Sequence, residues 1–305
     1  MAGHSRSKNG VASLAYVPAI RVFAVGKERH GCPHSRKNFT EEFLDLGLKD
    51  RVAIVTGASR GIGRACAAEL LAEGAHVVVA SQDPKRNAEA CRALSRKGGG
   101  RVLGIPFDIE SDDSVRLMVE RTLAEFGRLD ILVNNAALVS PGDLFTLSDE
   151  AWGKSFDKKL NGFARCMRHV IPPMRARKWG RIVNITGNAG REPQPRAVAT
   201  GMNNAAILNL TKAMAGELAR DGILLNAVSP AGTLTERVEE RMRKEAAASG
   251  KSEADVLRDR GAKLPLGRLG KSEEVAAVVA FLCSKRASYV VGCAWQVDGG
   301  AMAAI

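Results

Sequence analysis

Two kinds of segment alternate along the chain from Leu46 onward. Short runs are apolar at almost every position, as in RVAIVT at Arg51–Thr56, and this pattern indicates strands buried on both faces. Between them lie longer segments with the apolar spacing of helices. The predicted strands are Arg51–Thr56, Ala75–Ala80, Arg101–Phe107, Leu129–Val133, Arg181–Ile185, Leu224–Val228 and Ala294–Val297. The predicted helices are Gly61–Glu73, Pro84–Arg96, Asp112–Phe126, Trp152–Arg175 and Ala197–Arg220.

This alternation predicts an α/β fold, a single-domain, Rossmann-like, doubly wound sheet of seven parallel strands with helices on both faces. Because crossovers between parallel strands are right-handed, we expect the ligand crevice at the carboxyl ends of the strands. The domain spans residues 46–305 and contains no internal repeat. One long, charged helical insertion, Thr233–Leu264, stands where a lid over the substrate would lie.

The first 45 residues have no sustained helical or strand period. They mix Gly, Ser, His and basic residues, which predicts a poorly ordered, basic N-terminal extension without a catalytic role. An Arg-rich, acid-poor leader also resembles an organelle transit peptide. Translated sequence upstream of a later start would explain the segment equally well, and the residues do not separate these origins.

The net charge of +12 raises the question of a nucleic-acid partner. Half of this excess falls in residues 1–40, which hold seven Lys and Arg against one Glu, and the remainder is spread along helices. A scattered distribution is typical of solvated surface, so we expect no nucleic-acid partner. No apolar run approaches the roughly 18 residues of a membrane span. The six cysteines lack metal-ligand spacing, which indicates reduced thiols, no metal and a cytoplasmic protein.

The segment Thr56–Gly63, TGASRGIG, lies between the first predicted strand and the first predicted helix. Its glycines allow the backbone to approach a pyrophosphate, and the helix N-terminus supplies amide donors and a positive dipole end. We call Thr56–Gly63 the glycine loop, and its strand–loop–helix context predicts dinucleotide binding.

The glycine loop resembles the TGxxxGIG loop of the short-chain dehydrogenase/reductase family. Asn134–Ala137 (NNAA) is similar to the family's NNAG, and Asp108–Ile109 to its adenine-contacting pair. Asn226–Pro230 resembles the segment leading to the nicotinamide, and Val297–Gly300 the C-terminal signature. The resemblance covers residues 48–305. The cofactor-binding residues that it implies are Gly57, Ser59, Arg60, Gly61, Ile62, Gly63, Ser81, Asp108, Ile109, Asn135, Ala136, Pro230 and Thr235.

The resemblance, which is to 3-oxoacyl-[acyl-carrier-protein] reductase-like members, implies an NAD(P)-dependent oxidoreductase acting on a small-molecule carbonyl/alcohol pair. It also implies a homodimer or homotetramer. NAD-preferring members carry an Asp at the end of the second strand, where this chain has Ser81 and Gln82. Ser81 can donate to a 2′-phosphate and Arg60 can pair with it, which favours NADP(H) over NAD(H). The alternative is that Arg60 is merely solvated.

The family's catalytic Ser, Tyr and Lys, and the Asn that completes its proton path, have no counterparts of the same type here. The resemblance places Gly187 at the Ser position, Thr200 at the Tyr position and Asn204 at the Lys position. Lys159 stands where the family has the Asn. The only two tyrosines of the chain are far from this motif in sequence.

Lys159 and Asn204 therefore look like an exchanged pair, and an ammonium would reach the crevice from the opposite wall. A desolvated lysine can act as a general acid or stabilise an oxyanion. The candidate catalytic residues are Lys159, Thr200, Asn204, Thr186 and Asn188.

Several alternatives stay open at this point. Lys159 could face solvent or a neighbouring subunit, and Thr186 could serve only if the loop has turned after the strand. The asparagines could simply satisfy backbone groups in a loop. A catalytically silent dinucleotide-binding homologue, acting as a partner subunit or sensor, is the competing function. Non-redox chemistry on the same fold is the third.

Overall fold

The structure is a computed structural model, and it describes residues 45–136 and 142–303. The chain divides into two units between Asp45 and Leu46, and all of the elements below belong to the second. The predicted N-terminal extension, apart from Asp45, lies outside the described residues.

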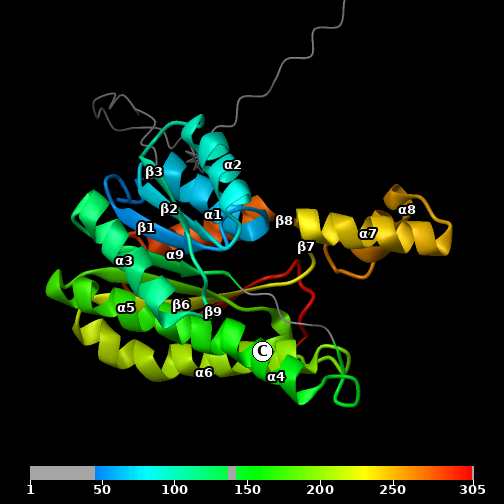
Figure 1. Ribbon diagram of the computed structural model, residues 1–305. Helices are drawn as coiled ribbons and strands as arrows, with labels where there is room; N and C mark the ends of the chain where they lie inside the picture. Colours follow the sequence, from blue (N-terminus) through cyan, green and yellow to red (C-terminus); the bar gives the residue numbers. More distant parts are fainter. Residues whose placement is uncertain (1–44, 137–141, 304–305) are drawn as a thin grey trace, which may run out of the picture. The chain divides into compact units, whose positions relative to one another are not determined.

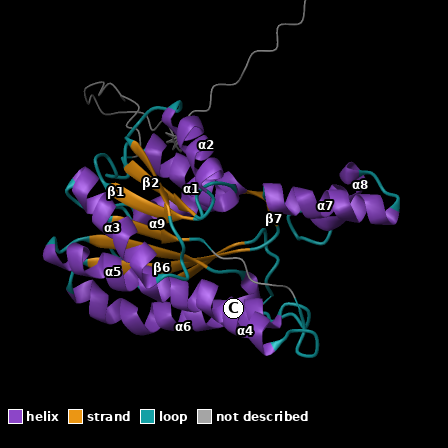
Figure 2. Ribbon diagram, viewed as in Figure 1, coloured by secondary structure: helices purple, strands orange, loops and turns teal. Residues whose placement is uncertain are grey.

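Seven strands form one fully parallel sheet in the order β3-β2-β1-β4-β5-β6-β9 (Figure 2). The strands are β1 (Val52–Thr56), β2 (His76–Ser81), β3 (Val102–Pro106), β4 (Ile131–Asn134), β5 (Gly180–Ile185), β6 (Ile223–Pro230) and β9 (Ala294–Val297). Every residue of β1 is buried, as the continuous apolar run predicts. The predicted fold class is confirmed, and the strand order reverses beside β1, between β1 and β4.

Helices cover both faces of the sheet. They are α1 (Gly61–Ala72), α2 (Pro84–Ser95), α3 (Asp112–Phe126), α4 (Asp149–Phe156), α5 (Gly162–Ala176), α6 (Val198–Arg220), α7 (Glu236–Ser249), α8 (Glu253–Gly261) and α9 (Ser272–Cys283). Successive residues of β1 point to opposite faces, so Val55 joins a core with α1, α2 and α9, whereas Ile54 joins a core with α3, α5 and α6 (Figure 1).

Local sequence explains where several helices begin and end. Ser111 caps α3 by accepting from the Ser114 backbone amide at 3.2 Å, and Gly127 ends it in the left-handed conformation at φ 68°. Asp83 caps α2 in the same way, with Pro84 at the first helical position. These boundaries are the ones that the sequence predicts most closely.

The predicted helix Trp152–Arg175 is not continuous. It begins earlier, at Asp149, because Ser148 caps α4 by accepting from the Ala151 amide at 3.2 Å. A π-helical turn, η1 (Asp157–Asn161), then separates α4 from α5. Such turns insert an extra residue into a helix and recur at functional sites.

Helix α9 was not predicted, although its sequence SEEVAAVVAFLC is strongly apolar. It packs against α1 and contributes Val275, Val279 and Leu282 to the core.

The predicted lid, Thr233–Leu264, contains two helices rather than one. Gly250, at φ 67°, ends α7, and Ser252 caps α8 by accepting from the Asp255 amide at 3.1 Å. At its base, β7 (Thr233–Leu234) pairs with β8 (Gly270–Lys271) in a separate two-stranded sheet. In Figures 1 and 2, α7 and α8 stand apart from the layers around the sheet.

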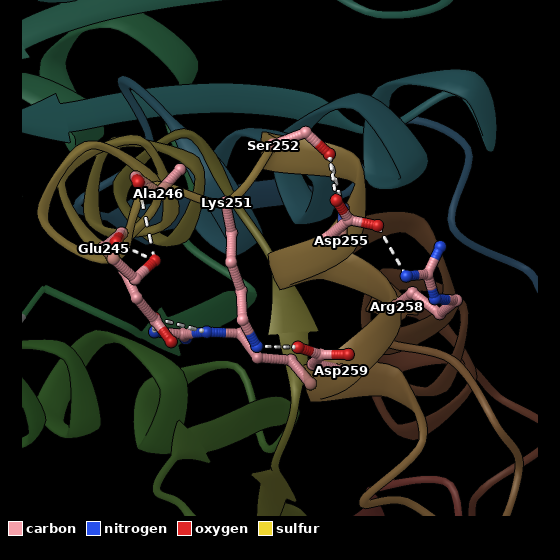
Figure 3. A network of polar contacts seen from close by, with 9 residues as sticks. Glu245, Ala246, Lys251, Ser252, Asp255, Arg258 and Asp259 are labelled. Carbon is pink, nitrogen blue, oxygen red and sulfur yellow. Dashed lines mark hydrogen bonds and ion pairs between the residues drawn. The ribbon is translucent and has the colours of Figure 1, made fainter.

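The two lid helices hold each other through their own contacts. Met242, Ala246 and Val256 form a small core of their own. Around it, polar side chains link α7 with α8 and the turn between them (Figure 3). Arg260 of α8 pairs with Glu245 of α7, and Lys251 of the turn pairs with Asp259 of α8, whereas Ser252–Asp255 and Arg258–Asp255 lie within α8 and its cap.

Candidate functional site

A cavity of about 420 Å³ opens where β1, β2, β3 and β4 end. This is the crevice that a doubly wound sheet offers to a ligand, next to its switch in strand order. Most of the predicted cofactor-binding residues line it. They are Gly57, Ser59, Arg60, Gly61, Ile62, Ser81, Asp108, Ile109, Asn135, Ala136 and Thr235.

Two predicted cofactor residues do not line this cavity. Gly63, at the end of the glycine loop, packs against its start, where a Cβ would lie 2.9 Å from the carbonyl carbon of Gly57. Glycine is therefore needed at this position because the backbone of Gly57 lies so close to it. Pro230 ends β6, in register with Val297 of β9.

The glycine loop is fixed by the segment that follows β4. The Thr56 Oγ1 atom accepts hydrogen bonds from the backbone amides of Asn135 and Ala136, each at 2.9 Å. The Asn135 side chain donates to the Thr56 carbonyl at 3.0 Å. Gly57 has a left-handed φ of 65°, and a Cβ there would lie 2.9 Å from the Ala136 Cα. The geometry therefore requires glycine at this position.

At the start of α1, the Gly61 amide donates to the Glu236 Oε2 atom at 2.8 Å. Glu236 also pairs with Arg64. A carboxylate of the lid thus accepts a hydrogen bond from a backbone amide at a helix N-terminus. Amides in this position bind phosphate in nucleotide sites.

Cationic and anionic side chains alternate around the cavity. The ion pairs are Arg60–Glu240 at 3.3 Å, Arg86–Asp83 at 3.4 Å and Lys158–Glu110 at 3.3 Å. Ser81 is buried, and its hydroxyl accepts from the Asn87 Nδ2 atom at 3.1 Å. Arg237 also lines the cavity, but it forms no ion pair within the described residues.

Sequence reasoning missed part of this lining. The missed residues are Gln82, Asp83, Arg86, Phe107, Glu110, Lys158, Glu236 and Arg237. Gln82, Phe107 and Glu110 adjoin predicted positions, so one further step along each loop would have found them. Glu236 and Arg237 follow the predicted Thr235 at the start of the lid, but the motifs carry no signal that their side chains reach the cavity.

A second group of residues lies around Lys159, in the π turn η1. The Lys159 side chain is buried, and its Nζ atom donates to the Asn204 Oδ1 atom of α6 at 2.6 Å. No carboxylate pairs with this ammonium among the described residues. Burial lowers the pKa of Lys159 to about 8. Its proton is thus held more weakly than that of a solvated lysine.

Asn204 joins Lys159 to the loop after β5. A Cβ on Gly187 would lie 3.0 Å from the Asn204 Nδ2 atom, and one on Gly190 would lie 2.8 Å from the Asn204 Cβ. Thr200, half-buried, stands one helical turn before Asn204 and therefore on the same side of α6. The structure thus brings the positions at Gly187, Lys159 and Asn204 together.

Asn203 fixes the π turn against α6. Its Oδ1 atom accepts from the Leu160 backbone amide at 3.3 Å, and its Nδ2 atom donates to the Ser155 hydroxyl at 3.0 Å. Asn203 is fully buried. This side chain satisfies a backbone donor of the irregular turn and so helps to hold Lys159 toward Asn204.

The other two candidate residues have different partners. The Thr186 hydroxyl lies 2.7 Å from the Ser229 hydroxyl and 3.2 Å from the Val228 carbonyl, so it is engaged with β6. The Asn188 Nδ2 atom donates to Asp298 at 2.7 Å. Its Oδ1 atom is buried without a partner within the described residues. Neither side chain is hydrogen-bonded to Lys159 or Asn204.

Other kinds of site find no support within residues 45–136 and 142–303. No group of three or more His, Cys, Asp or Glu side chains is placed to hold a metal ion. The five cysteines in these ranges are all free. None of the helices there is both long and apolar enough to cross a membrane.

Comparison with known proteins agrees with this geometry. A family described as Enoyl-(Acyl carrier protein) reductase matches residues 57–302. Cis-4-hydroxycyclohexanecarboxylate dehydrogenase of Sinomonas cyclohexanicum is 38% identical over 252 residues, which is 82% of this chain and 96% of that protein. A 3-oxoacyl-[acyl-carrier-protein] reductase of Staphylococcus aureus is 34% identical over 251 residues, 81% of this chain and 96% of its own.

Among solved structures, L-sorbose reductase of Gluconobacter frateurii, complexed with NADPH and L-sorbose, superposes with a TM-score of 0.83. It is 33% identical, and the match covers 86% of this chain and 100% of that one. The family match spans the whole cavity lining, from Gly57 to Arg237. The chain belongs to the short-chain dehydrogenase/reductase family.

Proposed function

We propose that the protein is an NADP(H)-dependent oxidoreductase that interconverts a small-molecule carbonyl and the corresponding alcohol, with Lys159 delivering the proton. The observation that carries this proposal is the 2.6 Å contact between the buried Lys159 ammonium and Asn204, directly beside Gly187. These are the positions at which the family has its Asn, Lys and Ser. A cation is thus retained where the usual catalytic types are absent.

The cavity at the strand ends fits a dinucleotide. Gly57, Gly61 and the N-terminus of α1 line it, and Arg60, Arg86 and Ser81 contribute positive charge and a hydroxyl to the same lining. The comparison supports the same cofactor, since L-sorbose reductase is complexed with NADPH. When bound, NADPH would supply a hydride to the carbonyl carbon.

The protein's own residues then have distinct tasks. Lys159 donates a proton to the carbonyl oxygen and is left as a neutral amine, and it takes a proton from the alcohol in the reverse direction. Because burial lowers the pKa of Lys159 to about 8, both protonation states are accessible near neutral pH. Asn204 holds the ammonium in place, and Thr200, on the same side of α6, can orient the substrate oxygen.

The test replaces this ammonium. Lys159→Met should reduce turnover by roughly 10²-fold or more, the range for a positioned acid, with NADPH affinity unchanged. The matched control is Lys154→Met on α4, since Lys154 is exposed and paired with Glu150. The readouts are NADPH turnover on a carbonyl panel that includes L-sorbose, NADP⁺ reduction with cis-4-hydroxycyclohexanecarboxylate, and fluorescence titration.

Two results would count against the proposal. If Lys159→Met keeps the full rate and the same pH profile, Lys159 has no catalytic role. If the parent protein binds NADPH but turns over no compound in the panel, the silent dinucleotide-binding homologue becomes the better account.

A further inference from the structure

The first turn of α7 is seated on the glycine loop by charged contacts. The Glu236 carboxylate accepts from the Gly61 amide at 2.8 Å and pairs with Arg64. One turn further along α7, Glu240 pairs with Arg60 at 3.3 Å. Two lid carboxylates therefore engage the amide and one of the cations that face the dinucleotide cavity.

A carboxylate and a phosphate compete for the same donors at a helix N-terminus, because both are anionic acceptors of backbone hydrogen bonds. We propose that the Glu236 carboxylate occupies a phosphate position of the dinucleotide site, that the cofactor pyrophosphate displaces it, and that Arg237 then becomes a further phosphate-binding residue. This inference rests on the proposed function, because it requires that the cavity binds a dinucleotide.

Arg237 supports the second half of the inference. It lines the cavity, and of the cations that do so it is the one without an ion pair inside the described ranges. Burial, together with repulsion from Arg241 and Arg60, lowers the pKa of Arg237. A phosphate that entered the cavity would offset this repulsion. The Glu236 carboxylate does not do so for Arg237, because it already accepts from the Gly61 amide and pairs with Arg64.

The exchange would also move the lid. Helices α7 and α8 share a small core and the polar network of Figure 3, so they respond as one body when the first turn of α7 is displaced. Besides the charged contacts of Glu236 and Glu240, this body is connected to the sheet domain through β7, which pairs with β8, and through the loop after α8. Cofactor binding would therefore set the position of the segment expected to cover the substrate.

The first experiment removes the competing charge. Glu236→Gln should bind NADPH and NADH about tenfold more tightly, as expected for losing one hydrogen bond from a charged group. The gain should be equal for the two dinucleotides, because the pyrophosphate is common to both. The matched control is Glu239→Gln, which removes the same charge from an exposed position in the same turn and should leave both affinities unchanged.

The second experiment removes the proposed ligand. Arg237→Met should weaken binding of both dinucleotides by about tenfold, the effect of one charge-assisted hydrogen bond. Arg243→Met, at an exposed position on α7, is the control and should change neither affinity. Fluorescence titration at one ionic strength measures all variants.

The outcomes separate the inference from the function beneath it. If the parent protein binds dinucleotides but Glu236→Gln and Glu239→Gln both match it, Glu236 does not compete with phosphate and the inference is wrong. A gain for NADPH alone would place Glu236 against the 2′-phosphate and would also overturn it. If neither parent nor variants bind a dinucleotide, the proposed function itself fails.

Discussion

Lys159 is an ammonium taken out of water with one amide oxygen as its hydrogen-bond partner in the described part of the chain. Burying a charge without a counter-ion destabilises the folded state, and the cost appears as a lowered pKa. Residues placed in this way are candidates for function rather than for stability. The reciprocal substitutions predict that an ammonium reaches the crevice from the opposite wall, and in the structure Lys159 donates to Asn204.

The pH dependence of stability provides a test that needs no substrate. The pKa of Lys159 falls from 10.5 to about 8 on folding. Between these values the unfolded chain holds a proton that the folded protein has released. The contribution of Lys159 to the free energy of unfolding therefore rises with pH from about 8 to 10.5. As pH falls through about 8 this contribution is lost, and below 8 it changes no further.

Lys159→Met should therefore gain stability relative to the parent at pH 7, and the difference should shrink by pH 10. The shrinkage is about 3 kcal/mol at most, from 1.4 kcal/mol per pKa unit. Denaturant unfolding of both proteins at pH 7 and pH 10 measures it, since all other groups cancel in the difference. A difference that is the same at both pH values would contradict an ammonium buried in the folded protein.

Cofactor choice also belongs to single residues. Because Ser81 and Arg60 both line the cavity, NADPH should bind more tightly than NADH. Arg60→Ala combined with Ser81→Asp should reverse the order, since a carboxylate at position 81 would repel a 2′-phosphate. The measurement is fluorescence titration of both dinucleotides at one ionic strength. Equal affinities in the parent protein would refute the predicted preference.

At the scale of elements, strands such as β1 and β2 could be predicted because they are buried on both faces, so that their apolar runs stand out in the sequence itself. The π turn could not. FDKKLNG is compatible with an ordinary helix, and the turn is stabilised by Asn203, a residue of another helix that accepts from the Leu160 amide. The split of the lid at Gly250 and Ser252 had a local signal that was overlooked.

In the candidate site, too, features set by local sequence could be predicted and features set by tertiary contacts could not. Cofactor residues that share a motif with their neighbours along the chain could be predicted from it. The contacts of Glu236 with Gly61 and Arg64 could not, because they depend on how the lid turns onto the glycine loop. Thr186 was placed by spacing alone, and its hydroxyl is engaged with Ser229.

The assembly of this chain into oligomers depends on which helices and strands present a surface to a second copy. The family resemblance implies an assembly through the two long helical segments, which are α4–α5 and α6 in this chain. Strand β9 is an edge strand, and Trp295 on it is partly exposed. We predict a homodimer or homotetramer, which light scattering at micromolar concentration would detect. A scattering mass of 32.5 kDa, that of one chain, would refute it.

At the scale of the whole molecule, the sheet domain begins at Leu46. The Leu46 carbonyl accepts from the Lys285 amide at 3.0 Å, and the Leu48 side chain is buried. Both leucines lie after the predicted extension, whose sequence lacks the periodicity needed to pack on the core. Deleting residues 1–45 should therefore change the melting temperature by less than about 2 °C and leave cofactor affinity unchanged. Calorimetry of the truncated and full-length proteins measures this. A large fall in melting temperature would show that residues 1–45 stabilise the domain.

The π turn Asp157–Asn161 also sets the angular phase between α4 and α5. An α-helix advances by about 100° per residue, so an extra residue absorbed in one wide turn leaves the flanking helices in register with their neighbours. Cys166 and Val170 keep their places in the core while Lys159 turns toward α6. Deleting one residue of this turn should restore ordinary α-helical winding and rotate Lys159 away from Asn204, while α5 keeps its packing against the sheet.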